Sequence, residues 1–167
     1  TEAIDAVLAG LGPRAGDGVL IGEQAYGAVV QAARHVARGE GVRVVPLSLP
    51  VADSADIVAA WERALWPGTP LAIVDHVTSG TALVQPVAEI VAICRSRGIP
   101  VLIDGAHAPG MMDLQIDEIG ADWYAGNLHK WIGAPSGAGF LWTANEHRET
   151  TRPLAASHGV LESYQYA

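Results

Sequence analysis

The chain has 167 residues, of which half are apolar and 17% are charged, and 18 acidic against 10 basic side chains give a net charge of −8. This composition excludes a disordered chain, and the length suits one domain with a substantial core. The acidic balance argues against nucleic acid and anionic membranes as partners, and no apolar run approaches the roughly 18 residues of a membrane span. The expected partner is a small molecule.

The first residues and the cysteine content indicate the cellular compartment of the protein. A single cysteine excludes an internal disulfide framework, and the first residues lack the basic-then-apolar layout of a secretory signal. We therefore expect a cytoplasmic protein. The chain starts without methionine and already has helical spacing over residues 2–8, so we expect it to be a fragment.

Short β-rich runs alternate with stretches of helical spacing along the rest of the chain. The predicted strands are residues 18–21, 42–47, 71–75, 101–104, 123–125 and 140–142. The predicted helices between them are residues 28–37, 54–65 and 87–97. The last helix has a clear end, because Gly98 can adopt the left-handed conformation and Pro100 prevents continuation. The alternation predicts an α/β domain with a mainly parallel sheet flanked by helices.

Two residues inside the predicted helices have spacing typical of the core. Trp61 falls on one helical stripe with Ile57 and Leu65, and Cys94 lies inside the helix that ends near Gly98. We expect Trp61 to be a core residue and Cys94 to be a small buried hydrophobic residue rather than a nucleophile.

Chemistry is expected at the carboxyl ends of the strands, where open α/β sheets bind ligands. Asp75, Asp104 and Gly126 fall at such ends, and Lys130 follows shortly after the last of them. A lysine amine can hold pyridoxal phosphate as a Schiff base, while a carboxylate beside the pyridine nitrogen keeps that nitrogen protonated. By spacing alone, an exposed loop lysine and an ordinary turn aspartate remain the alternatives.

The segments 104–108 (DGAHA) and 127–131 (NLHKW) resemble the class V aminotransferase family of fold-type I pyridoxal phosphate enzymes, in particular its isopenicillin N epimerase-like branch. Residues 1–4, 75–79 and 157–159 also stand in family order, so the resemblance spans nearly the whole chain. It implies a pyridoxal phosphate-binding large domain over residues 1–167. The N-terminal arm and the C-terminal small domain of such an enzyme are expected to lie outside this chain.

The resemblance implies a role for each of several residues around the cofactor. Lys130 would be the catalytic residue, as the Schiff-base lysine and the carrier of the substrate's α-proton. Asp104 would pair with the pyridinium, and His107 would reach the phenolic oxygen, although a histidine in a turn is the plainer reading. His129 would contact the phosphate, as would Asn127, which stands where many relatives have serine.

Three further residues complete the expected cofactor site. Thr1, at the start of a helix, resembles a phosphate-binding threonine, although threonine is also a common N-cap. Ser79 would lie near the phenolic oxygen, with His76 and Thr78 as less well-defined neighbours. Tyr26 is a candidate platform for the cofactor ring, although an aromatic residue at a helix start more often serves packing. No metal site is expected.

The resemblance implies an enzyme that acts at the Cα of an amino acid, with an epimerase-like reaction preferred. The enzymatic alternative is a cysteine desulfurase or a cysteine-type C–S lyase, and the alternative of another class is an inactive binding fragment or paralogue. The full-length enzyme is expected to be a homodimer. The residue that binds the substrate carboxylate is expected outside this chain.

Overall fold

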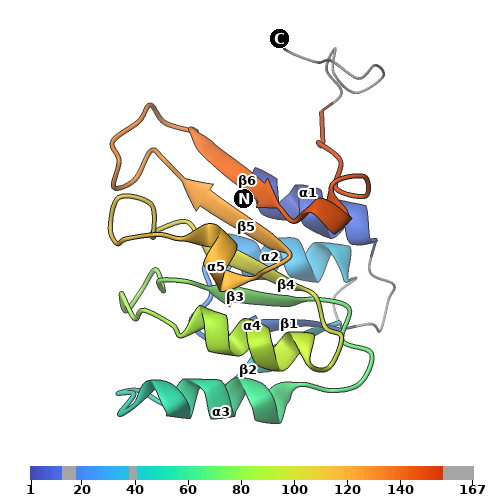
Figure 1. Cartoon of the computed structure of the whole chain (residues 1–167), viewed down its shortest axis with the longest axis vertical. Coiled ribbons are helices and arrows are strands. Elements are labelled where there is room, and N and C mark those ends of the chain that lie inside the picture. The colour runs from blue at the N-terminus through green and yellow to red at the C-terminus, as the bar shows by residue number, and fades with distance from the viewer. Residues whose placement is uncertain (13–17, 38–40, 156–167) are drawn as a thin grey trace.

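The computed structural model describes residues 1–12, 18–37 and 41–155, and its centre is a six-stranded sheet in the order β2-β1-β3-β4-β5-β6 (Figure 1). The first five strands are mutually parallel and β6 runs antiparallel to β5 at the edge. The strands are β1 (Val19–Gly22), β2 (Val42–Val45), β3 (Ala72–Asp75), β4 (Val101–Gly105), β5 (Trp123–Asn127) and β6 (Gly139–Thr143).

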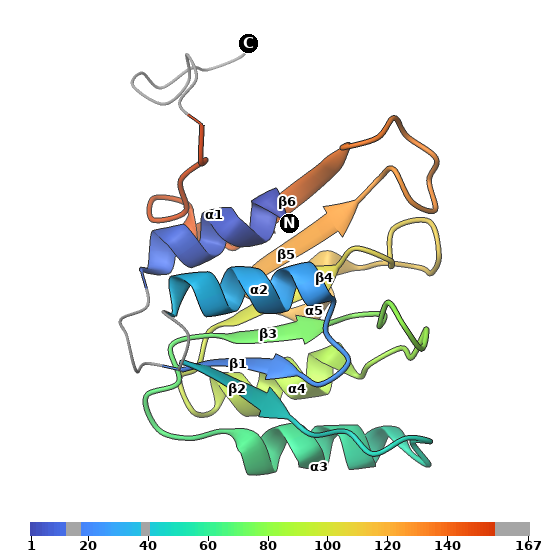
Figure 2. The ribbon, with the colours of Figure 1, turned by 180° about the vertical axis from the view of Figure 1, so that it is seen from behind.

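Helices cover both faces of the sheet, which confirms the predicted α/β architecture. Figure 1 shows α3, α4 and α5 in front of the sheet, and Figure 2, from behind, shows α1 and α2 in front. The helices are α1 (Glu2–Leu11), α2 (Gly27–Val36), α3 (Ser54–Ala64), α4 (Val87–Arg95), the short α5 (Ile116–Ile119) and the 3-10 helix η1 (Asn145–His147). None of these described helices is long and apolar enough to cross a membrane.

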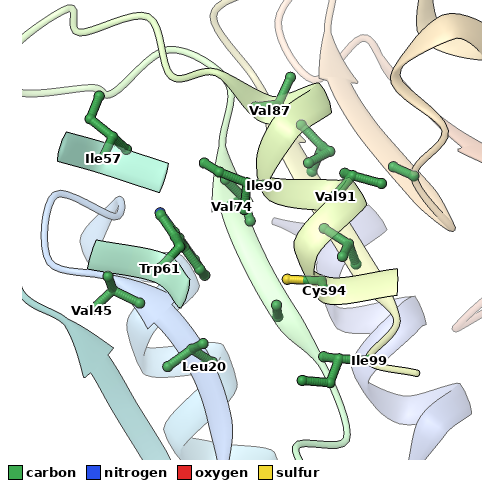
Figure 3. Packing of buried hydrophobic residues seen from close by; sticks show 14 of the residues in the cluster. Leu20, Val45, Ile57, Trp61, Val74, Val87, Ile90, Val91, Cys94 and Ile99 are labelled. Carbon is green, nitrogen blue, oxygen red and sulfur yellow. The ribbon is translucent and has the colours of Figure 1, made fainter. Parts of the chain in front are cut away.

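Each face of the sheet has its own apolar core because successive strand residues point to opposite sides. Figure 3 shows the core beneath α3 and α4, where Trp61 is 2% exposed and Cys94 is completely buried. Burial raises the pKa of the Cys94 thiol to about 12, so it stays protonated. Both residues are therefore core residues, as predicted.

Several element boundaries differ from the prediction, for local reasons. Strand β2 ends at Val45 rather than residue 47 because Pro46 has no amide hydrogen, and the Leu47 amide instead donates to Glu23 Oε2 at 2.8 Å. Strand β5 extends to Asn127 because β6 pairs with it antiparallel, a pairing that the sequence did not reveal. Helix α4 ends at Arg95, and Gly98 has the expected positive φ of 68° in the turn that follows. Helix α5 was not predicted.

Gly105, directly after Asp104, permits close packing between β4 and β5. A Cβ atom at this position would overlap the ring of Tyr124, which is fully buried and whose Oη lies 2.8 Å from His76 Nδ1. We expect Gly105→Ala to lower the free energy of unfolding by about 1–3 kcal/mol, the usual cost of overpacking a core. Chemical denaturation of the purified protein measures this.

The matched control for that substitution is Gly80→Ala, because a Cβ atom at Gly80 meets nothing within 4 Å and its φ is not in the left-handed region. Equal unfolding midpoints for the two variants would show that the ring of Tyr124 does not limit the space at Gly105.

Candidate active site

A cavity of about 680 Å³ lies at the carboxyl ends of β3, β4 and β5, beside the first turn of α1. The direction of the strand order reverses between β1 and β3, and ligands of open α/β sheets bind at such a point. The cavity is lined by all eight residues singled out from the sequence: Thr1, Tyr26, Ser79, Asp104, His107, Asn127, His129 and Lys130.

Asp104, the next-to-last residue of β4, lines this cavity from an almost fully buried position, with 6% of its surface exposed. Its Oδ1 accepts a hydrogen bond from the Ala106 amide at 3.1 Å. Burial raises the pKa of Asp104, and the charges of Lys130 and His107 act in the opposite direction. A positive charge bound next to a buried carboxyl group favours its ionised form, because it offsets the cost of removing the carboxylate from water.

Lys130 is the only lysine of the chain, and its amine points toward the imidazole of His107. Its Nζ lies 3.0 Å from His107 Nε2 and 5.9 Å from the centre of the Tyr26 ring. The other imidazole nitrogen, Nδ1, accepts a hydrogen bond from the indole nitrogen of Trp131 at 3.3 Å. Burial first, and then the charge of Lys130, lower the pKa of His107, while the charge of Asp104 acts in the opposite direction.

Further lining residues come from the start of α1, the end of β5 and the β5–β6 loop. Thr1 is the N-cap of α1, but its side chain makes no capping hydrogen bond. His129 Nδ1 donates to the Ala138 carbonyl at 2.8 Å, so Nε2 is the ring nitrogen left for a ligand. Because Asn127 ends β5 and the amide hydrogens of the first turn of α1 have no helical partner, this part of the cavity suits an anion.

Asp75 lines the cavity as well, and the sequence reasoning placed it at a strand end without assigning it to the site. Register pairs Asp75 with Asp104 on the neighbouring parallel strand, which puts two buried acids side by side. The signal was present in the sequence, because two predicted apolar strands, residues 71–75 and 101–104, each end in aspartate. Phe140 and Arg152 also line the cavity, and neither was predicted.

Two neighbours suggested for Ser79 lie outside the lining. His76 is buried and bonded to Tyr124, and burial lowers the pKa of His76. The Thr78 hydroxyl is 2.7 Å from that of Thr81 and accepts from the Leu83 amide at 2.8 Å. Both side chains therefore stabilise the structure behind the site, because alternate residues after β3 point away from the cavity.

A separate polar cluster lies at the amino ends of β4 and β5, at the other end of these strands from the cavity. Asp122 precedes β5, accepts from the Val101 amide at 2.7 Å, and pairs with His147 Nε2 at 2.8 Å. The carboxylate of Glu146 completes a group whose ligand atoms lie within 4.8 Å of one another. Because Asp122 and His147 already satisfy each other, this cluster is explained by its structural role.

The family model of class V aminotransferases matches residues 1–166. The chain belongs to the class V aminotransferase family. Two curated relatives of this family are isopenicillin N epimerase of Streptomyces clavuligerus, 38% identical over 159 residues, and putative L-cysteine desulfhydrase 1 of Oryza sativa subsp. japonica, 40% identical over 161 residues. The matches cover 94% and 90% of this chain but only 40% and 32% of the relatives.

Two solved structures share the fold. The complex of the cystine C-S lyase C-DES with its product cysteine persulfide matches with a TM-score of 0.81 and 30% identity, over 91% of this chain and 41% of that chain. The cysteine desulfurase CsdA from Escherichia coli has a TM-score of 0.83 over 99% of this chain and 42% of that chain. At 20% identity, the likeness to CsdA shows the fold alone.

The cofactor of the class V family is pyridoxal 5'-phosphate (PLP), and one C-DES structure holds glycine covalently linked to it. The residues of the cavity fit this group. A single lysine amine and a buried carboxyl face the same space, and the Thr1 side chain, which makes no capping hydrogen bond, and the first turn of α1 offer donors to a phosphate. The segment 157–159, which also carries the resemblance, lies outside the described residues.

Proposed function

We propose that residues 1–167 form the PLP-binding large domain of a longer enzyme that acts at the Cα of an amino acid. The observation that carries this proposal is the meeting of the Lys130 amine and the buried Asp104 carboxyl in one cavity at the carboxyl ends of the parallel strands. The relatives are much longer than this chain. We place the N-terminal arm, the small domain and the residue that binds the substrate carboxylate in that additional sequence.

Lys130 and Asp104 have distinct roles in the proposed enzyme. When bound, PLP supplies a pyridine ring that withdraws electrons from the Cα of an attached amino acid. Lys130 anchors the cofactor through its amine and moves a proton to or from Cα. Asp104 supplies the charge that holds the pyridine nitrogen protonated, and the pairing offsets the cost of burying its carboxylate.

The other lining residues would orient the cofactor. Thr1, Asn127 and His129 Nε2 are proposed to bind the phosphate, in line with their place beside the first turn of α1. His107 and Ser79 are proposed to face the phenolic oxygen. The Tyr26 ring is proposed as the stacking platform, because it lies beside the Lys130 amine.

Epimerisation is our first proposal for the reaction, supported by the identity to isopenicillin N epimerase. The second candidate is C–S bond cleavage of cysteine or cystine, favoured by the comparable likeness to an L-cysteine desulfhydrase and to the C-S lyase C-DES. Sulfide or persulfide release identifies the second candidate. Exchange of the α-proton with deuterium, with the amino acid otherwise recovered intact, identifies the first.

The proposal extends to assembly and location. We propose a homodimer in which a second subunit completes the cavity, and a cytoplasmic enzyme, in line with its single cysteine. Light scattering of the purified full-length protein tests the first statement, and fractionation of the producing cells tests the second.

The function is tested by trapping the cofactor. We expect incubation of the purified protein with one equivalent of PLP, followed by borohydride reduction and peptide mass spectrometry, to place a pyridoxyl label on Lys130. The Lys130→Arg variant, which keeps the charge but cannot form the link, should lose that label. A Lys130 peptide that is labelled no more than in the protein unfolded by guanidinium chloride would contradict the proposal and would favour an inactive binding fragment.

A further inference from the structure

Two consecutive polar contacts join Trp131, His107 and Lys130. The indole Nε1 of Trp131 lies 3.3 Å from His107 Nδ1, and His107 Nε2 lies 3.0 Å from Lys130 Nζ. The imidazole comes from the loop after β4, whereas the two residues that it bridges are neighbours in the loop after β5. Trp131 is 55% exposed, so its contact with His107 is not a consequence of core packing.

The donors and acceptors of these three groups allow one arrangement of protons. An indole N–H can only donate, so His107 Nδ1 must be the nitrogen without a proton. A neutral imidazole then has its proton on Nε2 and donates it toward Lys130 Nζ. An ammonium group has no lone pair and cannot accept this bond, whereas an uncharged amine can.

The opposite charge state breaks the chain of hydrogen bonds. If Lys130 is an ammonium ion, His107 Nε2 must accept, its proton moves to Nδ1, and two N–H groups then face each other at the Trp131 contact. The Trp131 contact and the charged Lys130 therefore compete through the tautomer of one histidine. The neutral ring that this competition requires is supported by burial, which lowers the pKa of His107.

We propose that Trp131 is a positioning residue whose indole N–H fixes the tautomer of His107 and thereby favours the uncharged amine of Lys130. The uncharged amine is the form that attacks a carbonyl and that accepts a proton. This inference rests on the proposed function for its purpose, but the proton arrangement itself needs no bound cofactor.

Other charged and titratable groups face the same space and act on the amine in both directions. The Asp104 carboxylate and the Tyr26 ring stabilise the ammonium form, by charge and by a cation–π contact. The remaining ionisable side chains that line the cavity are Glu2 of α1, Asp75 of β3, His129 of the β5–β6 loop and Arg152. All of them are unchanged by a substitution at Trp131, so a comparison of variants isolates the indole N–H.

The test is the pH dependence of Lys130 acylation in the cofactor-free protein. Trp131→Phe keeps an aromatic ring and removes the N–H. The rate of trace acetylation of Lys130 by acetic anhydride is measured as a function of pH. In Trp131→Phe we expect the midpoint of this curve to rise by up to about one pH unit, and the rate at neutral pH to fall by up to about tenfold. Peptide mass spectrometry against an added reference amine measures the rate at Lys130.

Two further variants make the outcome decisive. Trp142→Phe makes the same chemical change on β6, at the position that pairs with Tyr124 of β5, and should leave the midpoint where it is in the unchanged protein. In a His107→Gln background, Trp131→Phe should add no further shift, because the imidazole that connects Trp131 to Lys130, and with it this tautomer relay, is already absent. An unchanged midpoint in Trp131→Phe, an equal shift in Trp142→Phe, or a full shift that persists without His107 would each overturn the inference.

The acylation result is independent of the proposed function. Failure of PLP to label Lys130, together with the expected midpoint shift, would sink the proposed function and leave the tautomer relay standing. A Lys130 peptide that is labelled normally in a protein without the shift would sink the relay alone.

Discussion

Replacing Lys130 with alanine should reduce turnover of an amino acid by the full-length protein by more than about a thousandfold. Loss of general acid–base catalysis alone costs about 10²–10⁴-fold, and the same substitution removes the covalent anchor of the cofactor. No second lysine in these 167 residues can replace it. Turnover with saturating PLP, followed as α-proton exchange and as sulfide release, measures the effect under both candidate reactions.

Arg34→Ala is the matched control for this loss of a positive charge, because Arg34 is exposed on α2 and does not line the cavity. The control should retain nearly full turnover. Turnover by Lys130→Ala above about a tenth of the unchanged protein would contradict the role of Lys130, since neither general acid–base catalysis nor a covalent anchor is that small an effect.

The alternation of apolar strands and amphipathic helices was enough to predict the layered α/β sheet, because buried parallel strands leave a continuous apolar signal. The antiparallel partner of β5 was not predictable in the same way. Residues 140–142 were predicted as a strand, but a short, half-buried edge strand has no sequence pattern that tells its direction. The direction of an edge strand depends on the loop before it, which here turns back after Lys130.

Much of the cavity could be predicted because parallel strands end at one edge of a sheet. Asp104 lies near the end of β4 and Lys130 comes three residues after the neighbouring strand β5, so both are expected at the same edge of the sheet. Arg152 was beyond such reasoning, since it reaches the cavity through a segment after β6 whose path has no sequence signal. The contact between Trp131 and His107 likewise depends on the shape of two loops.

Asp75 illustrates a signal that was available but not used. Its strand pairs with β4 in register over four residues, from Ala72 opposite Val101 to Asp75 opposite Asp104. Residues that pair in register on parallel neighbouring strands lie at the same level and point to the same face of the sheet. Asp75 and Asp104 therefore lie side by side, and two carboxylates held there cannot both ionise without cost.

That cost should appear as a pH-dependent stability of the cofactor-free protein. Burial, and secondarily the charge of Asp104, raise the pKa of Asp75 from 3.8 to about 7. Between these two values the unfolded chain releases a proton that the folded protein retains, so this residue's contribution to stability is full below about pH 4 and falls as the pH rises toward 7. Across this window the loss amounts to up to about 4 kcal/mol.

Asp75→Asn should therefore stabilise the cofactor-free protein by up to about 4 kcal/mol at pH 8 and change little at pH 4, because an amide keeps the shape of the protonated acid and cannot ionise. Urea denaturation at both pH values measures the difference between the variant and the unchanged protein, so contributions from other groups cancel. Asp56→Asn, at an exposed position on α3, is the control and should show no such pH-dependent gain. A gain at pH 8 no larger than that of the control would mean that Asp75 ionises in the folded protein as easily as in water, and that the two adjacent acids do not compete for a proton.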